Sequence, residues 1–169
     1  LNHHDDAPKY SANALKALYR AEGPVIFGKA TRRILWPLRG PKYDGEGLRA
    51  VMDKYFGLAR LSGASVDVLV PAYDLDAREP VFFKSWEAKE GPDWYMADVA
   101  VATASAPTYL PPATVQSVDG RQTRRLWDGG LAANCPAMCA YAEAKRHCPS
   151  ADVILVSIGA GDSAQAIDY

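Results

Sequence analysis

The sequence has little of several features, and each shortage excludes a class of protein. No apolar run approaches the ~18 residues that cross a bilayer, and the first residues follow no signal-peptide pattern, so we expect a cytoplasmic domain with at most peripheral membrane contact. The three cysteines, Cys135, Cys139 and Cys148, are an odd count that fits no disulfide framework and favours reduced thiols. A net charge of −1 directs the chain neither to nucleic acid nor to a strongly anionic membrane.

The composition and the apolar patterning predict one α/β domain. Apolar residues make up 49% and charged residues 23% of the 169 residues, which is ordinary for a globular protein with a real core. Helical and strand patterns alternate, so we expect a three-layer α/β/α sandwich with a mixed, largely parallel sheet. The expected helices cover residues 12–22, 46–60, 96–105 and 136–147, and the expected strands cover residues 66–72, 80–86, 113–117, 122–127 and 152–158.

Three of these elements carry specific expectations. Ser11 can cap the first helix, which Gly23 and Pro24 should end. Asn134 can cap the last helix, with Pro136 in its first turn. The strand at 152–158 is almost wholly apolar, which is typical of a buried parallel strand.

Asp128 is the main candidate functional residue. It lies in the stretch LWDGGLAANCPAMCAYAEA (residues 126–144), where a strand should end and a tight loop should begin. Gly129 and Gly130 allow positive φ angles and the close approach of another group. This is a sensible place for a catalytic carboxylate and equally for a plain turn, since Asp-Gly is a common turn dipeptide. These residues alone leave both readings open.

A second stretch brings in a family resemblance. Residues 100–112 read AVATASAPTYLPP, residues 10–27 read YSANALKALYRAEGPVIF, and residues 153–161 read VILVSIGAG. Together with the Asp-Gly-Gly loop and its Asn-Cys-Pro continuation, and in this order, they resemble the patatin-like phospholipases. Val101, the Ala104-Ser105 order and Cys135 depart from the family pattern, and the first puts a local salt bridge in doubt.

The resemblance implies an acyl hydrolase with a serine–aspartate dyad, no metal and no cofactor. A serine hydroxyl needs a nearby base, and Asp128 matches the family's aspartate, with Gly129 and Gly130 as its active-site loop. The family's GxSxG elbow has no counterpart, since the nearest sequence, residues 63–67, lacks the final glycine. The glycine-rich oxyanion stretch is also missing. We therefore expect residues 1–169 to be a partial patatin-like domain downstream of the nucleophile elbow.

The expected partners follow from the same resemblance. They are an acyl-lipid substrate and either the N-terminal remainder of the same protein or a second copy of the chain, with no nucleic acid. The basic residues around Trp36 could touch lipid headgroups, although a solvated loop is the simpler reading.

Other functional readings stay open. The main alternative is a non-catalytic patatin-like domain that binds lipid or a partner. A Ser-His-Asp triad using His147 has the right chain order but little else in its favour. Two residue sets could bind a metal. Cys135, Cys139 and His147 are one set, but packed thiols are the favoured reading of the two cysteines. The terminal residues His3, His4, Asp5 and Asp6 are the other, and a solvated terminus is the favoured reading there.

Overall fold

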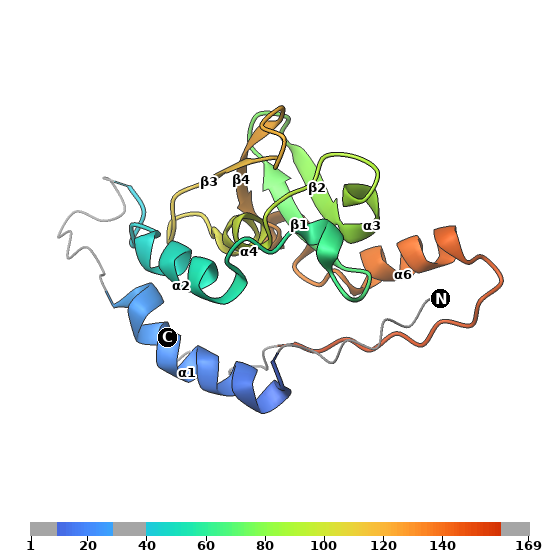
Figure 1. Cartoon of the computed structure of the whole chain (residues 1–169), viewed down its shortest axis with the longest axis horizontal. Coiled ribbons are helices and arrows are strands. Elements are labelled where there is room, and N and C mark those ends of the chain that lie inside the picture. The colour runs from blue at the N-terminus through green and yellow to red at the C-terminus, as the bar shows by residue number, and fades with distance from the viewer. Residues whose placement is uncertain (1–9, 29–39, 160–169) are drawn as a thin grey trace, which may run out of the picture.

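The computed structural model describes residues 10–28 and 40–159, which form an α/β structure around one four-stranded sheet (Figure 1). The strand order is β2-β1-β4-β3 and every pairing is antiparallel. The α/β class is thus confirmed, but the expected largely parallel sheet is wrong for the described residues. The strands are β1 (Leu69–Asp74), β2 (Glu79–Lys84), β3 (Ala113–Gln116) and β4 (Thr123–Asp128).

The antiparallel pairing follows from two short turns, at residues 74–78 and at Asp119-Gly120, where the residue types in the sequence predict turns. After β1, Asp74 Oδ1 accepts hydrogen bonds from the amides of Asp76 (2.9 Å) and Ala77 (3.0 Å), which closes the β1–β2 hairpin. Between β3 and β4, Gly120 takes a left-handed φ of 72°. A two-to-six-residue connection can only join antiparallel neighbours, whereas parallel strands need a long crossover.

The core lies between the sheet and α4 (Met96–Ala104), which contacts β1, β3 and β4. The small residues that the sequence shows in this helix allow close packing, and Ala102 is fully buried. Phe83 of β2 meets Trp94 edge-on, with ring centroids 5.2 Å apart. The buried apolar cluster consists of Leu61, Ala72, Phe83, Ala88, Trp94, Val99, Ala102, Ala113, Val115 and Leu126.

The first two helices depart from the predicted lengths. Ser11 caps α1 (Ala12–Phe27) as predicted, with its Oγ accepting from the Ala14 amide at 3.2 Å, but the helix continues through Gly23 and Pro24 instead of ending there. Packing of the last turn of α1 against α2 keeps the helix intact past the proline, although Pro24 lacks the N–H of one helical hydrogen bond. In contrast, α2 (Glu46–Phe56) ends before residue 60, because Gly57 takes a φ of 54°.

The chain after the sheet forms two helices where one was predicted. A short helix, α5 (Gly130–Ala133), follows Asp128 directly, and α6 (Ala137–His147) follows α5. Asn134 has helical dihedral angles (φ −57°, ψ −33°) and α6 has no side-chain cap, so the predicted Asn134 cap is wrong. The remaining elements are the short helix α3 (Ser85–Ala88) and the 3-10 turn η1 (Leu61–Gly63).

The apolar segment at residues 152–158 does not form the predicted buried strand. It leaves α6 and runs back beside that helix without joining the sheet (Figure 1). Ile154, Val156 and Ile158 expose 92%, 74% and 90% of their surface. A strand that is apolar on both faces needs a neighbouring strand and cover on two sides. The strands of the described residues pair only with one another, so residues 152–158 have no strand beside them and no cover on their two faces.

Candidate active site

Asp128 lies where the sequence predicted it, at the end of a strand and the start of a loop. It is the last residue of β4 and stands opposite Ala72 of β1. Its backbone N–H donates to the carbonyl of Ser105 (2.9 Å), and its carboxylate oxygen Oδ1 accepts from the Gly130 amide (2.7 Å). The side chain is half-buried. The position of the carboxyl group is therefore fixed from both sides of the residue.

The two glycines after Asp128 serve different purposes. A Cβ atom at Gly129 would lie 2.3 Å from the carbonyl oxygen of Pro71 in β1, so only glycine fits against that strand. This confirms the expected close approach. The positive φ angles that glycine allows are not used, because Gly129 has a φ of −62° and Gly130 is the first residue of α5. A helix start thus follows Asp128.

Ser105 contacts the backbone of Asp128, a contact that sequence reasoning missed. It ends α4 and is 2% exposed, and its Oγ donates to the Val101 carbonyl at 2.8 Å. Its own carbonyl accepts from the Asp128 amide, which joins two of the four stretches that carried the family resemblance. The signal in the sequence was the serine directly before the Ala-Pro that ends the helical pattern.

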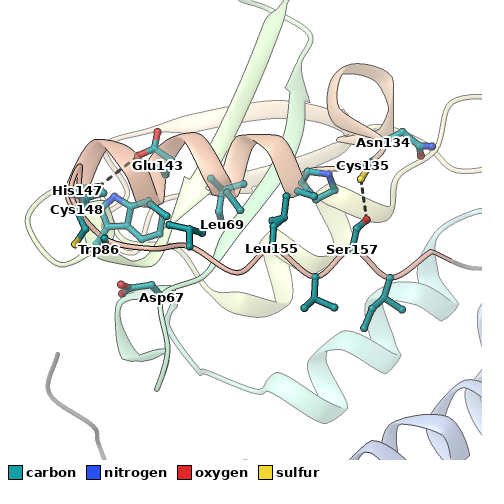
Figure 2. Close-up of a pocket in the computed structure, with 18 of the residues that line it drawn as sticks. Asp67, Leu69, Trp86, Asn134, Cys135, Glu143, His147, Cys148, Leu155 and Ser157 are labelled. Carbon is teal, nitrogen blue, oxygen red and sulfur yellow. Dashed lines mark hydrogen bonds and ion pairs between the residues drawn. The ribbon is translucent and has the colours of Figure 1, made fainter.

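A groove lies beside this site rather than at Asp128. It has a volume of about 1120 Å³ and runs between α6 and residues 153–159, with Leu69 and Trp86 in its wall (Figure 2). Asn134 and Cys135 stand at one end, a short distance along the chain from Asp128. Most of the lining side chains are apolar. The groove could hold an extended apolar group.

Cys135 is one of two exposed thiols that line this groove, the other being Cys148. The Cys135 Sγ lies 3.4 Å from the Ser157 hydroxyl. That hydroxyl, and secondarily the Ala137 amide, lowers the pKa of the Cys135 thiol below its ordinary value. Hydrogen bonds to sulfur favour the charged thiolate, which is the nucleophilic form.

His147 lies at the opposite end of the groove from Cys135 (Figure 2). Its Nε2 is 3.6 Å from Glu143 Oε2, and its ring packs edge-on to Trp86 with centroids 5.6 Å apart. Within the ranges 10–28 and 40–159, no group of three or more His, Cys, Asp or Glu side chains is arranged to hold a metal ion. Residues 3–6 and most of the basic residues around Trp36, with Trp36 itself, lie outside the described ranges.

Comparison with known proteins places these features in a family. The model of the patatin-like phospholipases matches residues 4–141, which covers both stretches joined at Asp128. The chain belongs to the patatin-like phospholipase family. Patatin-like protein 2 of Arabidopsis thaliana is 35% identical over 147 residues, which cover 80% of this chain and 36% of the relative.

Two further relatives show the same partial coverage. Patatin-like protein 4 of Arabidopsis thaliana is 31% identical over 96% of this chain and 45% of its own length. Patatin-1-Kuras 2 of Solanum tuberosum is 31% identical over 85% of this chain and 39% of its own length. This patatin-like chain therefore spans less than half the length of these relatives. In the part that the structure describes, every helix is too short or too polar to cross a membrane.

Proposed function

We propose that this chain supplies the carboxylate of a serine–aspartate lipid acyl hydrolase, with Asp128 as the base. Membership of the patatin-like phospholipase family supports acyl lipids as the substrate class. The observation that carries the residue assignment is the double attachment of Asp128, through its amide to Ser105 and through Oδ1 to Gly130. A base must keep its position while a proton moves, and these two bonds hold it there.

The chemistry assigned to Asp128 is proton acceptance from a serine hydroxyl that this chain does not contribute. The Gly130 amide occupies Oδ1, and Oδ2 makes no hydrogen bond with any of the described residues, so it is the oxygen for the serine proton. As its proton moves to Asp128, the serine oxygen would attack the ester carbonyl; the ester's alcohol would leave with that proton and give an acyl-enzyme, which water then hydrolyses to the free acid and the serine. A three-layer arrangement of the complete domain, with the serine brought to Asp128, is part of this proposal.

The test compares two substitutions of Asp128 in the full-length protein. Asp128→Asn keeps an oxygen that can accept from Gly130 but cannot take a serine proton, whereas Asp128→Ala loses both. We expect both variants to lose nearly all hydrolysis of a p-nitrophenyl ester, and the asparagine variant to melt close to the wild type. Asp152→Asn, a charge-matched change at an exposed site, should retain activity. An asparagine variant within a few-fold of wild-type turnover would refute the assignment.

A non-catalytic lipid- or partner-binding domain is the second candidate. The bond from the Gly130 amide to Asp128 Oδ1 favours it, because a plain turn aspartate makes the same contact. The two substitutions separate the candidates. If Asp128 only shapes the turn, the alanine variant should be destabilised while the asparagine variant behaves as the wild type in every assay.

The exposed apolar segment also leads to a proposal about partners. Ile154, Val156 and Ile158 are each more than two-thirds exposed, and such a patch favours association. We expect the 169 residues alone to self-associate unless they are bound to the remainder of their own protein, and to show no ester turnover without a nucleophilic serine. Light scattering and p-nitrophenyl ester hydrolysis on the isolated chain test this. A monodisperse monomer that melts cooperatively would refute the first expectation, and serine-dependent turnover the second.

A further inference from the structure

Gly130 borders a small polar space at the start of α5. A Cβ atom on this residue would lie 3.1 Å from Asp128 Oδ1, 3.3 Å from Asn134 Oδ1 and 3.7 Å from Asp128 Cγ. Two polar side chains therefore enclose the position that a side chain of residue 130 would take. Because glycine has none, the space between the carboxylate and the carboxamide stays open.

The short helix α5 brings Asn134 to this space. Asn134 has helical dihedral angles and follows Gly130 by one turn. Side chains of helical residues lean toward the helix N-terminus, so the side chain of Asn134 extends over Gly130. The turn itself is anchored, since two amides of α5 donate to the carbonyl of Gly129 at 3.0 and 2.8 Å and Gly129 packs against β1. The carboxamide is thus held beside the Asp128 carboxylate.

Asn134 has no structural task within the described ranges that would explain its side chain. It does not cap α6, and its carboxamide makes no hydrogen bond with any residue in ranges 10–28 and 40–159. It is exposed and stands at one end of the groove beside α6 (Figure 2). A carboxamide without an internal partner, next to a carboxylate proposed as a base, is placed to bind a reactant.

The two oxygens that face the space determine what it can bind. Both are acceptors, and Asp128 Oδ1 keeps a lone pair beyond the one that the Gly130 amide occupies. A group that binds to both side chains needs two donor hydrogens, which water has and a serine hydroxyl does not. We propose that Asn134 Oδ1 and the Asp128 carboxylate together bind the water that hydrolyses the acyl-enzyme. This inference rests on the proposed serine–aspartate hydrolase.

The water is consumed in the second half of the reaction only. Its oxygen bonds to the acyl carbon while one of its protons moves to the Asp128 carboxylate. The bond from the acyl carbon to the serine oxygen then breaks, the serine oxygen takes the proton from Asp128, and the free acid leaves. Asn134 accepts the second hydrogen of the water and so turns a lone pair of the water oxygen toward the acyl carbon.

The two half-reactions of the full-length protein with a p-nitrophenyl ester test this role. Stopped-flow release of p-nitrophenol measures acylation, and mass spectrometry of the quenched protein follows decay of the acyl-enzyme. Asn134→Ala should acylate at about the wild-type rate, whereas its acyl-enzyme should decay about tenfold more slowly, the factor expected for one lost hydrogen bond. Asn13→Ala, the same change at an exposed position of α1, should decay as the wild type. Unchanged decay in Asn134→Ala, or an equal loss in both steps, would overturn the proposal.

A second variant fills the space instead of removing the carboxamide. The methyl group of Gly130→Ala would occupy the position between the two side chains, and the backbone permits it because Gly130 has no positive φ. Its acyl-enzyme should also decay more slowly. The double variant with Asn134→Ala should be no slower than the slower single variant, since both remove the same water, and multiplied losses would contradict this.

Asp128→Asn separates this inference from the proposed function. It should lose acylation itself. If it does so while the acyl-enzyme of Asn134→Ala decays as the wild type, the water site alone is wrong. If Asp128→Asn acylates at the wild-type rate, the assignment of the base is wrong and the water site falls with it.

Discussion

Replacing Gly129 with alanine tests whether the Asp128 loop depends on its contact with β1. The added Cβ would lie 2.3 Å from the Pro71 carbonyl oxygen, 2.5 Å from its carbon and 2.7 Å from the Pro71 Cβ. A comfortable contact needs about 1 Å more, and the opposing atoms belong mainly to backbone, which cannot rotate away. The φ of −62° suits alanine, so the whole effect is steric.

The expected destabilisation is at the upper end of the range for overpacking. A forced backbone shift costs typically 1–3 kcal/mol, and we expect about 3 kcal/mol for Gly129→Ala because β1 pairs with strands on both sides and cannot move alone. The assay is urea denaturation of the full-length protein, with ester hydrolysis measured in parallel. Gly63→Ala is the matched control, since its methyl group meets no atom within 4 Å. If the two variants unfold at the same urea concentration, the close approach of Gly129 to β1 is not what requires a glycine.

Two further expectations concern titration. A hydrogen bond from Lys54, and secondarily one from Tyr55, lowers the pKa of Glu22 below its ordinary 4.5. These bonds therefore stabilise the folded protein above pH 4.5, and the stabilisation is lost as acid protonates the folded carboxylate. Glu22→Gln should remove this acid-dependent part of the curve of unfolding free energy against pH. The lowered pKa of Cys135 predicts that it reacts with iodoacetamide faster than the other thiols below pH 8, and that Ser157→Ala slows it. Mass spectrometry of the labelled peptides measures the rate at Cys135. An equal rate of labelling in Ser157→Ala and in the wild type would contradict this expectation.

The sequence predicted best where local chemistry decides the conformation. The Asp74 turn, the Asp119-Gly120 turn and the Ser11 cap each depend on neighbours within a few residues, and all three are predicted by residue types. The position of Asp128 followed from the same local logic, because an apolar strand pattern met a glycine pair. The contact with Ser105 could not be foreseen, since it joins residues 23 positions apart through the backbone.

The wrong predictions share another cause. Gly23 and Pro24 usually end a helix, but here packing decides: the carbonyl oxygen of Val25 lies 2.2 Å from where a Cβ of Gly47 would be, which seats the last turn of α1 against α2. The apolar segment at 152–158 reads as a buried strand, yet burial depends on what else is present to cover it. Periodicity reports what a segment would bury, and only the surrounding elements determine whether it does.

The proline inside α1 should give that helix an uneven protection against hydrogen exchange. Pro24 has no N–H, so the helix lacks one internal hydrogen bond at this point and the carbonyl one turn earlier goes unpaired within the helix. Residues before Pro24 are joined to α2 mainly through Glu22, whereas those after it pack closely against Gly47. Amide deuteration should therefore divide α1 at Pro24, with the N-terminal turns exchanging through local opening while the last turn exchanges together with α2.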